Sequence, residues 1–511
     1  MNFALFLRQH ALYRPERSAF ITNRVWTYGE LDKRVDALAA ALMRAGIVER
    51  DRVAVLMKNS IEFIEVFLAC SRIGAVFVPL NFRLAPDEIR FSLDHGRVKA
   101  IVVQPDYSGM IKELEPELSW LNWSSVASWD EAAGEVAYSQ LGDSSDGNRL
   151  AASNPIEDVP LSSDSPQRIL YTSGTTARPK AAIVTHGQVI AASAARVVDF
   201  RLNCEDVTIT AGPLYHVGAM DTFMTTMLYL GGATVIIDKF DPENSLRLID
   251  EYGVTATWLA PTMIRMLLDA NVSAGRDLSS LRVVVAGGEA SPASLLDRED
   301  SELPNVHFYN AYGLTESQGL VTVLDPEQRR DKFGSVGRVA WLREMRIVDG
   351  DDREVPPGTP GEIVARGPVV FPGYLYDEQA TSVALRGGWL HTGDVGYLDD
   401  DGYLFVVDRK KDMILSGGEN IASSEVERVL DKHEAVDEVA VVGMPDDRWG
   451  EVPVAYIVSR GGEIDAEELS QFCRQRLAKF KVPVRFHLLE TMPRNSTGKV
   501  SKAQLREMAK A

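Results

Sequence analysis

A short stretch of hydroxyl, glycine and lysine residues is the most informative part of the chain for chemistry. Between Tyr171 and His186 the sequence reads YTSGTTARPKAAIVTH, and a strand-like QRILY leads into it. The residues available to a ligand there are Thr172, Ser173, Gly174, Thr175, Thr176 and Lys180. Backbone amides, hydroxyl donors and an ammonium on a tight loop suit polyphosphate, although the GxxxxGK[ST] spacing of a Walker A loop is absent. The residues alone leave two interpretations open, a phosphate-binding loop or a hydroxyl-rich turn between strands.

Further segments follow in a fixed order along the chain. They are PLYHVGA at 213–219, AGGEA at 286–290, YNAYGLTE at 309–316, the long GGWLHTGDVGYLDDDGYLFVVDRKKDMILSGGENI at 387–421, and PRNSTGKVSK at 493–502. Together with the loop, whose usual family pattern is [ST]SGTTGxPKG, they resemble the acyl-adenylate-forming superfamily over nearly the whole chain. That superfamily includes acyl-CoA synthetases, luciferases and peptide-synthetase adenylation domains. The resemblance is closest to medium- and long-chain acyl-CoA synthetases and coumarate–CoA ligases.

The resemblance implies a nucleotide site built from several of these segments. Adenine would stack on Tyr312, and its edge would be bordered by Asn310, Ala311, Gly288 and Glu289. Thr315 would donate to the α-phosphate of ATP, and Glu316 would hold Mg²⁺ through hard oxygen ligands. Asp394 would accept hydrogen bonds from both ribose hydroxyls, and Arg409 would reach the ribose or phosphate. Without the resemblance, Asp394 would equally suit a turn cap and Arg409 a surface charge.

Two half-reactions are implied, and they need different surroundings. In the first, Lys499 would place its ammonium between the carboxylate of the acid and the α-phosphate, which stabilises the in-line displacement of pyrophosphate. In the second, a loop with close backbone approach would line the path of CoA, and its residues are Ser416, Gly417 and Gly418. The family alternates between the two by swinging its small domain about a hinge, which falls here on Lys411.

The acyl group would lie beside the segment PLYHVG. His216, next to Tyr215, resembles the aromatic gate of the family, although a histidine in an apolar stretch also suits an ordinary core position. Gly218 leaves room nearby, and Gly313 is assigned to the same pocket. Trp258 is either a pocket wall or a core residue. The sequence does not indicate which acid is bound.

Two alanines depart from the family pattern. Ala177 ends SGTTA, where glycine is usual, and Ala181 follows the lysine where PKG is usual. Glycine tolerates positive φ and lets amides approach phosphate, and an alanine held at positive φ costs on the order of 1–2 kcal/mol. Such strain would disturb the β- and γ-phosphates more than the single phosphate of an acyl-adenylate.

The implied enzyme is an acid–CoA ligase that converts ATP, a carboxylic acid and CoA to acyl-CoA, AMP and pyrophosphate. A luciferase-type oxygenase shares every one of these motifs, and three further alternatives stay open. The alanines suggest a ligase with impaired adenylation that takes a preformed acyl-AMP from an upstream adenylating enzyme. A stand-alone enzyme that loads a carrier protein is the second, although we expect no carrier domain after Lys499. A non-catalytic acyl-adenylate sensor is the third, but it would be expected to have lost Lys499, Asp394 or Glu316.

The elements that position these residues read as a layered α/β fold. Thr27 and Glu30 have the spacing of a capping box, with Leu31, Val35 and Leu38 following at helical spacing. Short apolar runs predict buried strands at 53–56, 100–103, 233–237, 255–259 and 283–285. A second capping box is predicted at Ser424 and Glu427.

We therefore expect a large multi-layer N-terminal lobe, with mixed sheets and flanking helices, and a small mobile α+β C-terminal domain. The predicted ranges are 1–408 for the large adenylate- and acyl-binding domain, 409–411 for the hinge and 412–511 for the small domain. At 511 residues the chain is too long for one ordinary core, which agrees with this division.

Charge and composition restrict the partners. The net charge of −19 argues against a general nucleic-acid binder. The cysteines Cys70, Cys204 and Cys473 form no CxxC pair, which favours a reducing, cytoplasmic setting. No run of about 18 apolar residues and no signal peptide is evident, so no transmembrane segment is expected. The oligomeric state is left open.

Overall fold

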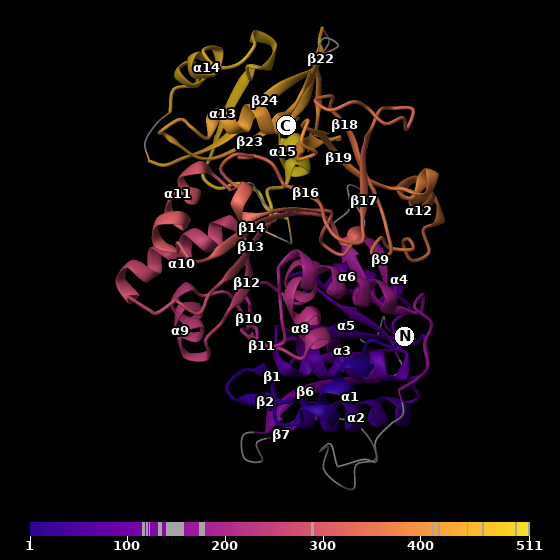
Figure 1. Ribbon diagram of the computed structural model, residues 1–511. Coiled ribbons are helices and arrows are strands. Elements are labelled where there is room, and N and C mark those ends of the chain that lie inside the picture. The colour runs from indigo at the N-terminus through magenta and orange to yellow at the C-terminus, as the bar shows by residue number, and fades with distance from the viewer. Residues whose placement is uncertain are drawn as a thin grey trace. The chain divides into compact units, whose positions relative to one another are not determined.

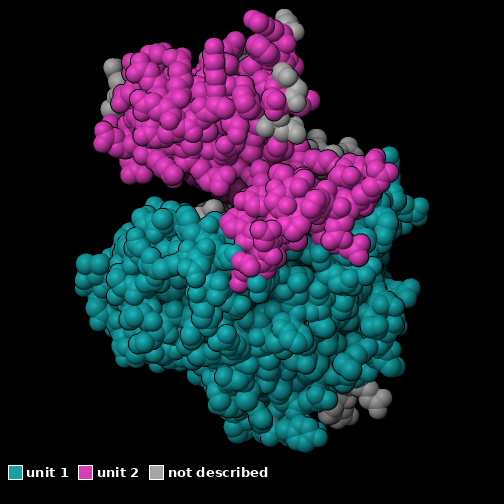
Figure 2. All heavy atoms as spheres, turned by 45° about the horizontal axis from the view of Figure 1, so that its top comes forward, with its two compact units in different colours: residues 1–345, 365–390 teal, residues 346–364, 391–511 magenta. Residues whose placement is uncertain are grey.

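The structure, a computed structural model, describes residues 1–114, 118, 121, 123–130, 135–138, 158–172, 179–287, 291–410, 412–416, 419–446, 448–461, 464–495 and 498–508. Its chain divides into two compact units (Figure 2). One comprises residues 1–345 and 365–390, and the other comprises residues 346–364 and 391–511. The range predicted as a hinge begins at the last residue of β20 (Leu404–Arg409), within the second unit. Lys411 itself lies outside the described residues.

The first unit holds two mixed sheets (Figure 1). One has the strand order β7 (Glu135–Tyr138), β6 (Trp123–Asp130), β5 (Ala100–Val103), β3 (Arg52–Leu56), β4 (Val76–Pro79), β8 (Pro166–Thr172) and β9 (Lys180–Thr185). The other has the order β16 (Arg338–Val339), β15 (Thr322–Leu324), β14 (His307–Tyr312), β13 (Val283–Gly287), β12 (Ala256–Leu259), β10 (Val207–Thr210), β11 (Ala233–Ile236), β1 (Ser18–Ile21) and β2 (Val25–Thr27). In both sheets the inner strands are parallel and the outer pairs are antiparallel. Each of the apolar runs predicted as buried strands overlaps one of these strands.

The first unit also contains helices. Their bounds are α1 (Ala4–Tyr13), α2 (Tyr28–Arg44), α3 (Ile61–Ile73), α4 (Pro86–His95), α5 (Ser108–Leu114), α6 (His186–Asp199), α7 (Val217–Ala219), α8 (Thr225–Leu230), α9 (Pro242–Tyr252), α10 (Pro261–Ala274), α11 (Ala293–Glu302) and α12 (Glu378–Ala384). Several of them, including α3, α6 and α10, pack on these sheets. The predicted capping box of α2 is confirmed, because the Glu30 amide donates to Thr27 Oγ1 at 3.2 Å and the Thr27 amide donates to Glu30 Oε2 at 2.9 Å. Its apolar stripe, including Leu31, Val35 and Leu38, is buried. No described helix is both long and apolar enough to cross a bilayer.

The second unit combines sheet and helix around its own core. One sheet runs in the order β17 (Glu344–Val348), β18 (Gly361–Arg366), β19 (Leu390–Leu398) and β20. The other runs in the order β22 (Glu419–Ile421), β21 (Ile414–Ser416), β24 (Gly450–Ser459) and β23 (Val436–Asp446), with β25 (Arg485–Leu489) also pairing with β24. The helices are α13 (Ser423–Leu430), α14 (Ala466–Arg474) and α15 (Lys502–Met508). The predicted fold class, a large α/β lobe and a small α+β domain, is confirmed.

The second predicted capping box is wrong. Helix α13 begins two residues earlier than the predicted cap requires, at Ser423 with Ala422 as its N-cap, and the side chain of Ala422 forms no capping hydrogen bond. The amide of Ser424 and the hydroxyl of Ser423 both donate to Asp408 Oδ2, at 3.3 and 2.6 Å. Glu427 instead accepts from the amide of Val441 at 2.7 Å. A carboxylate from β20 thus takes the place of the local cap.

Candidate active site

The two strands that flank the hydroxyl-rich loop form an antiparallel hairpin. Thr172, the last residue of β8, pairs with Lys180, the first residue of β9, and Thr172 Oγ1 donates to the Lys180 carbonyl at 3.3 Å. The predicted phosphate-binding residues Thr172 and Lys180 are therefore neighbours at the end of one sheet. Their companions Ser173, Gly174, Thr175 and Thr176, and also Ala177, lie outside the described residues.

Ala181 does not carry the strain expected of it. It lies inside β9 opposite Tyr171, and it is absent from the described residues with positive φ. Its side chain is buried, at 1% exposure, in an apolar cluster with Ile169 and Val78. An extended strand position suits alanine better than glycine, so this half of the argument for impaired adenylation is wrong.

Replacing Ala181 with glycine is expected to lower the melting temperature without raising the adenylation rate. The change removes a buried methyl and adds backbone freedom in a strand, which together cost about 1–2 kcal/mol. Thermal unfolding and acid-dependent exchange of pyrophosphate into ATP measure the two effects. A several-fold faster exchange in Ala181→Gly would show that the phosphate loop does need glycine there.

A tight turn after β14 presents Thr315 and Glu316. The single helical turn Thr315–Ser317 is closed by hydrogen bonds from the Gly319 amide to the Leu314 carbonyl, at 2.8 Å, and from the Leu314 amide to Ser317 Oγ, at 3.2 Å. Glycine is required at 313, because a Cβ there would lie 2.5 Å from the Leu320 amide nitrogen. Gly313 is thus explained by backbone packing, and its predicted contact with an acyl group stays a prediction.

Glu316 is held by a residue that the sequence did not indicate. The Tyr374 hydroxyl donates to Glu316 Oε1 at 2.6 Å, and Lys180 Nζ lies 4.9 Å from the centroid of the same ring. Burial, and then the negative charge of Glu316, raises the pKa of Tyr374. The predicted metal carboxylate and the predicted phosphate lysine therefore share Tyr374. Nothing in the sequence near Tyr374 links it to Glu316, so only the fold could have found it.

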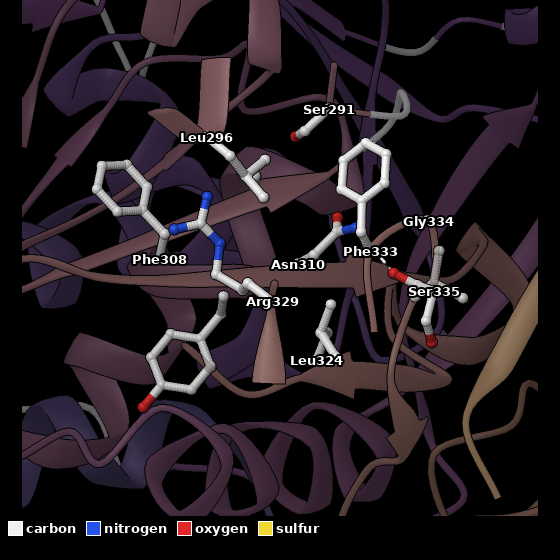
Figure 3. Close-up of a pocket in the computed structure, with 12 residues that line it drawn as sticks. Ser291, Leu296, Phe308, Asn310, Leu324, Arg329, Phe333, Gly334 and Ser335 are labelled. Carbon is white, nitrogen blue, oxygen red and sulfur yellow. Dashed lines mark hydrogen bonds between the residues drawn. The ribbon is translucent and has the colours of Figure 1, made fainter. Parts of the chain in front are cut away.

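The predicted adenine segments lie on neighbouring strands. Gly287 at the end of β13 pairs with Ala311 on β14, so the segments containing residues 288–289 and 310–312 are adjacent. Gly288 and Glu289 lie outside the described residues, whereas Tyr312 ends β14 and is partly exposed. Asn310 donates to the Ser335 carbonyl at 3.4 Å and lines a pocket of about 60 Å³ (Figure 3). Ser291 and Phe333 also line this pocket, together with Phe308 and Tyr309 of β14.

The predicted acyl segment is fixed from behind by a buried amide. Asn59 Nδ2 donates to the carbonyls of Gly212 and Ile237, at 2.9 and 3.0 Å, and its Oδ1 accepts from the Leu214 amide at 2.7 Å. These bonds set the course of the chain into Tyr215 and His216. His216 precedes α7 and is partly exposed, and its ring centroid lies 5.4 Å from that of Tyr215. Asn59 is a second positioning residue that sequence reasoning missed.

Trp258 lies beside both the predicted acyl segment and the end of β13, which leads into the predicted adenine segment. A Cβ at Gly212, Gly218 or Gly287 would lie 3.2, 3.4 or 3.3 Å from its indole ring. Gly212 and Gly218 belong to one stretch of chain and Gly287 ends β13, and the lack of a side chain at each leaves room for the ring. Trp258 is only partly buried. This surrounding favours a pocket wall over an ordinary core position.

A buried ion pair ties three of these segments together. Arg168 on β8 donates to Asp221 Oδ2 at 2.5 Å and to Gln318 Oε1 at 3.2 Å, and all three side chains are buried. Asp221 lies in the π-helical turn Met220–Met224 that follows α7, and Gln318 follows Glu316. Burial lowers the pKa of Arg168, and the charge of Asp221 opposes that shift. The strand before the predicted phosphate loop, the predicted acyl segment and the turn containing Glu316 thus share one buried network.

The remaining predicted residues belong to the second unit. Asp394 and Arg409 are paired across β19 and β20, with Arg409 Nε 3.4 Å from Asp394 Oδ1. The Asp394 side chain is 14% exposed and that of Arg409 is 57% exposed. Ser416 ends β21 and is buried, whereas Gly417 and Gly418 lie outside the described residues.

Lys499 is exposed at the end of a narrow turn. Asn495 brackets its backbone: Asn495 Oδ1 accepts from the Lys499 amide at 3.0 Å, and the Asn495 amide donates to the Lys499 carbonyl at 2.8 Å. Gly498 has a φ of +86°, a conformation that favours glycine. Arg494 donates to the Gly498 carbonyl at 3.0 Å. Hydrogen bonds among Arg494, Asn495, Gly498 and Lys499 therefore hold the backbone of Lys499.

Comparison with known proteins places these observations in one family. The family model described as AMP-binding enzyme matches residues 7–375, and that of the AMP-binding enzyme C-terminal domain matches residues 425–499. A feruloyl-CoA synthase of an Amycolatopsis species is 37% identical over 481 residues, covering 94% of this chain and 93% of the relative. A 2-succinylbenzoate–CoA ligase of Bacillus cereus is 35% identical over 504 residues, covering 98% of each.

Solved structures agree over the full length. The o-succinylbenzoate CoA synthetase of Bacillus subtilis, in complex with its acyl-adenylate intermediate, superposes with a TM-score of 0.87 at 30% identity, covering 99% of this chain and 98% of that one. ATP-bound MatB of Rhodopseudomonas palustris superposes with a TM-score of 0.88 at 28% identity, covering 100% of this chain and 99% of that one.

Proposed function

We infer the individual steps from one premise: the chain belongs to the AMP-binding enzyme family and is an acid–CoA ligase that works through an acyl-adenylate. We propose that it activates an aromatic carboxylic acid with ATP and transfers the acyl group to CoA. The observation behind the choice of an aromatic acid is the packing of Trp258 beside three glycines. The pairing of Thr172 with Lys180 and the link from Lys180 through Tyr374 to Glu316 support the ATP-dependent step.

The first step is a displacement at the α-phosphorus of ATP. A carboxylate oxygen of the acid forms a bond to phosphorus while the bond from phosphorus to the bridging oxygen breaks, and pyrophosphate leaves. We assign Thr172, Lys180 and the loop between them to the triphosphate and Thr315 to the α-phosphate. Lys499 would offset the charge that gathers as the two anions meet. Asp394, with Arg409 beside it, would hold the ribose.

Glu316 is the residue of the first unit that we assign to Mg²⁺. The Glu316 side chain is buried, and one of its oxygens already accepts from Tyr374. The described residues contain no cluster of three or more His, Cys, Asp or Glu side chains that could cage a metal. Mg²⁺ commonly takes one or two carboxylates and completes its shell with phosphates and water, so Glu316 fits it. When bound there, the ion would neutralise charge on the phosphates.

The second step forms the thioester. The sulfur of CoA bonds to the acyl carbonyl carbon, the bond from that carbon to the phosphate oxygen breaks, AMP leaves, and the thiol proton passes to water. Ser416, with Gly417 and Gly418, would border the thiol arm of CoA, and His216 would lie at the acyl group. No side-chain nucleophile is needed, because positioning supplies much of the rate.

An aromatic acid fits the wall that Trp258 provides. Stacked or edge-on aromatic pairs add about 0.5–1.5 kcal/mol beyond the area that they bury. A Cβ at Gly218 or Gly287 would lie 3.4 or 3.3 Å from the ring, so these glycines leave space beside it. The names of the two relatives, a feruloyl and a succinylbenzoate ligase, both denote aromatic acyl groups.

Aromatic acids are expected to exceed straight-chain acids of equal carbon number in kcat/KM for thioester formation. Replacing Trp258 with leucine should reduce that preference by about 2- to 10-fold, the equivalent of one aromatic pair. A panel of benzoic, cinnamic and alkanoic acids, with CoA and ATP, measures the preference. The control is Trp341→Leu, because Trp341 is 60% exposed. Equal turnover of alkanoic acids by the unaltered enzyme would contradict the aromatic assignment.

A further inference from the structure

A short segment, residues 371–375, joins the strand after the phosphate loop to the turn that carries Glu316. The Phe371 amide donates to the Glu316 carbonyl at 2.8 Å. On its other side, the Ile183 amide donates to the Gly373 carbonyl at 3.1 Å and the Leu375 amide donates to the Ala181 carbonyl at 2.8 Å. This segment is therefore hydrogen-bonded to both parts of the predicted phosphate and metal site.

The backbone around Tyr374 is constrained to one conformation. Gly373 has a φ of +146°, and a Cβ there would lie 2.5 Å from Thr381 Cγ2. Thr381 Oγ1 accepts from the Tyr374 amide at 2.9 Å and donates to the Asp377 carbonyl at 2.7 Å. The Phe371 ring packs edge-on against Tyr374, with centroids 4.8 Å apart. The Tyr374 side chain is thereby aimed before any ligand arrives.

Each end of the Tyr374 side chain meets a different charge. Its hydroxyl donates to Glu316 Oε1 at 2.6 Å, which engages one carboxylate oxygen and fixes the plane of the group. Its ring lies under the ammonium of Lys180, with Nζ 4.9 Å from the centroid. One side chain therefore sets the positions of an anion and a cation that are 136 residues apart in the chain, the difference between 316 and 180.

We propose that Tyr374 is a positioning residue of the adenylation half-reaction, which orients Glu316 toward Mg²⁺ through its hydroxyl and Lys180 toward the triphosphate through its ring. This inference rests on the proposed function. It makes Tyr374 specific to one half of the cycle, because transfer from a preformed acyl-adenylate involves neither triphosphate nor its metal. A residue needed only for folding would affect both halves alike.

Two substitutions separate the hydroxyl from the ring. Tyr374→Phe is expected to raise the Mg²⁺ concentration for half-maximal pyrophosphate exchange by about tenfold, the lower end for the loss of a group that orients a metal ligand. Tyr374→Leu should in addition weaken ATP binding without Mg²⁺ by about 2- to 5-fold, because the cation–π contact to Lys180 is lost. Both variants should form thioester from synthetic acyl-adenylate and CoA at near the unaltered rate.

Calorimetry of ATP binding, with and without Mg²⁺, supplies a readout that requires no turnover. In Tyr374→Phe the gain in ATP affinity that Mg²⁺ gives should shrink, and the affinity without Mg²⁺ should not change. The matched control is Tyr376→Phe, in the next turn of chain, where the ring is 52% exposed and lies over Arg97. Melting temperatures identify any variant that folds poorly.

The outcomes separate this inference from the proposed function. An unaltered enzyme that exchanges no pyrophosphate with any acid would refute the proposed function, and the calorimetry would still test Tyr374. An unchanged Mg²⁺ dependence in Tyr374→Phe would overturn the inference. So would equal losses in both half-reactions, or the same shift in Tyr376→Phe.

Discussion

Replacing Lys499 with alanine is expected to slow acyl-adenylate formation by about a hundred- to a thousandfold and to leave thioester formation from preformed acyl-adenylate nearly unchanged. The estimate is that of removing one group that stabilises developing charge in a transition state. The charge problem exists only while carboxylate and α-phosphate approach each other, so the second half-reaction does not need this ammonium. Lys499 is exposed, and its backbone bonds with Asn495 do not involve its side chain. These two backbone hydrogen bonds should therefore remain after the substitution.

Pyrophosphate exchange and thioester formation from synthetic acyl-adenylate measure the two halves for Lys499→Ala. Lys432→Ala is the control, because Lys432 is another exposed lysine of the second unit. Equal slowing of both halves would assign Lys499 to the general integrity of the second unit instead. An unchanged exchange rate would remove it from the chemistry altogether.

Local signals in the sequence predicted the elements, and they succeeded where the partners are a few residues apart. The cap of α2 needs only Thr27 and Glu30, so its spacing was sufficient. The cap predicted at Ser424 has the same spacing and fails, because Asp408 reaches both Ser423 and Ser424. The carboxylate of Asp408, which is distant in sequence, accepts the Ser424 amide in place of the nearby Glu427. The spacing of Ser424 and Glu427 cannot predict this contact.

The motifs of the site could be predicted from the sequence. The residues that position them, Tyr374 and Asn59, could not. Tyr374 contacts Glu316 across 58 residues, Asn59 contacts Gly212 across 153, and both depend on which strands become neighbours. Ala181 shows the opposite error. The motif compares it with a loop glycine, whereas pairing with Tyr171 puts it in an extended strand. The spacing of a motif indicates which residues could take part in a reaction. The backbone conformation of those residues depends on which strands pair.

The network of Arg168, Asp221 and Gln318 leads to the second large effect. Replacing Asp221 with alanine should destabilise the first unit by about 3–5 kcal/mol, because it leaves the guanidinium of Arg168 buried without its counter-charge. Both half-reactions should fall together, since Arg168 precedes the phosphate loop and Gln318 follows Glu316. That joint loss distinguishes this network from Lys499 and Tyr374, which act in one half only.

A paired substitution tests whether the charge itself is responsible. Arg168→Met with Asp221→Leu removes both charges and keeps apolar volume, and such exchanges are often neutral or stabilising. The double variant should therefore regain most of the melting temperature lost in Asp221→Ala. As a matched control, Arg366→Met breaks an ion pair with Glu344 at 2.7 Å whose side chains are 45% and 58% exposed. Exposed pairs contribute about 0–1 kcal/mol, so the control should melt within a degree or two of the unaltered protein. If Asp221→Ala also melted there, the buried pair would not be what holds the three segments in register.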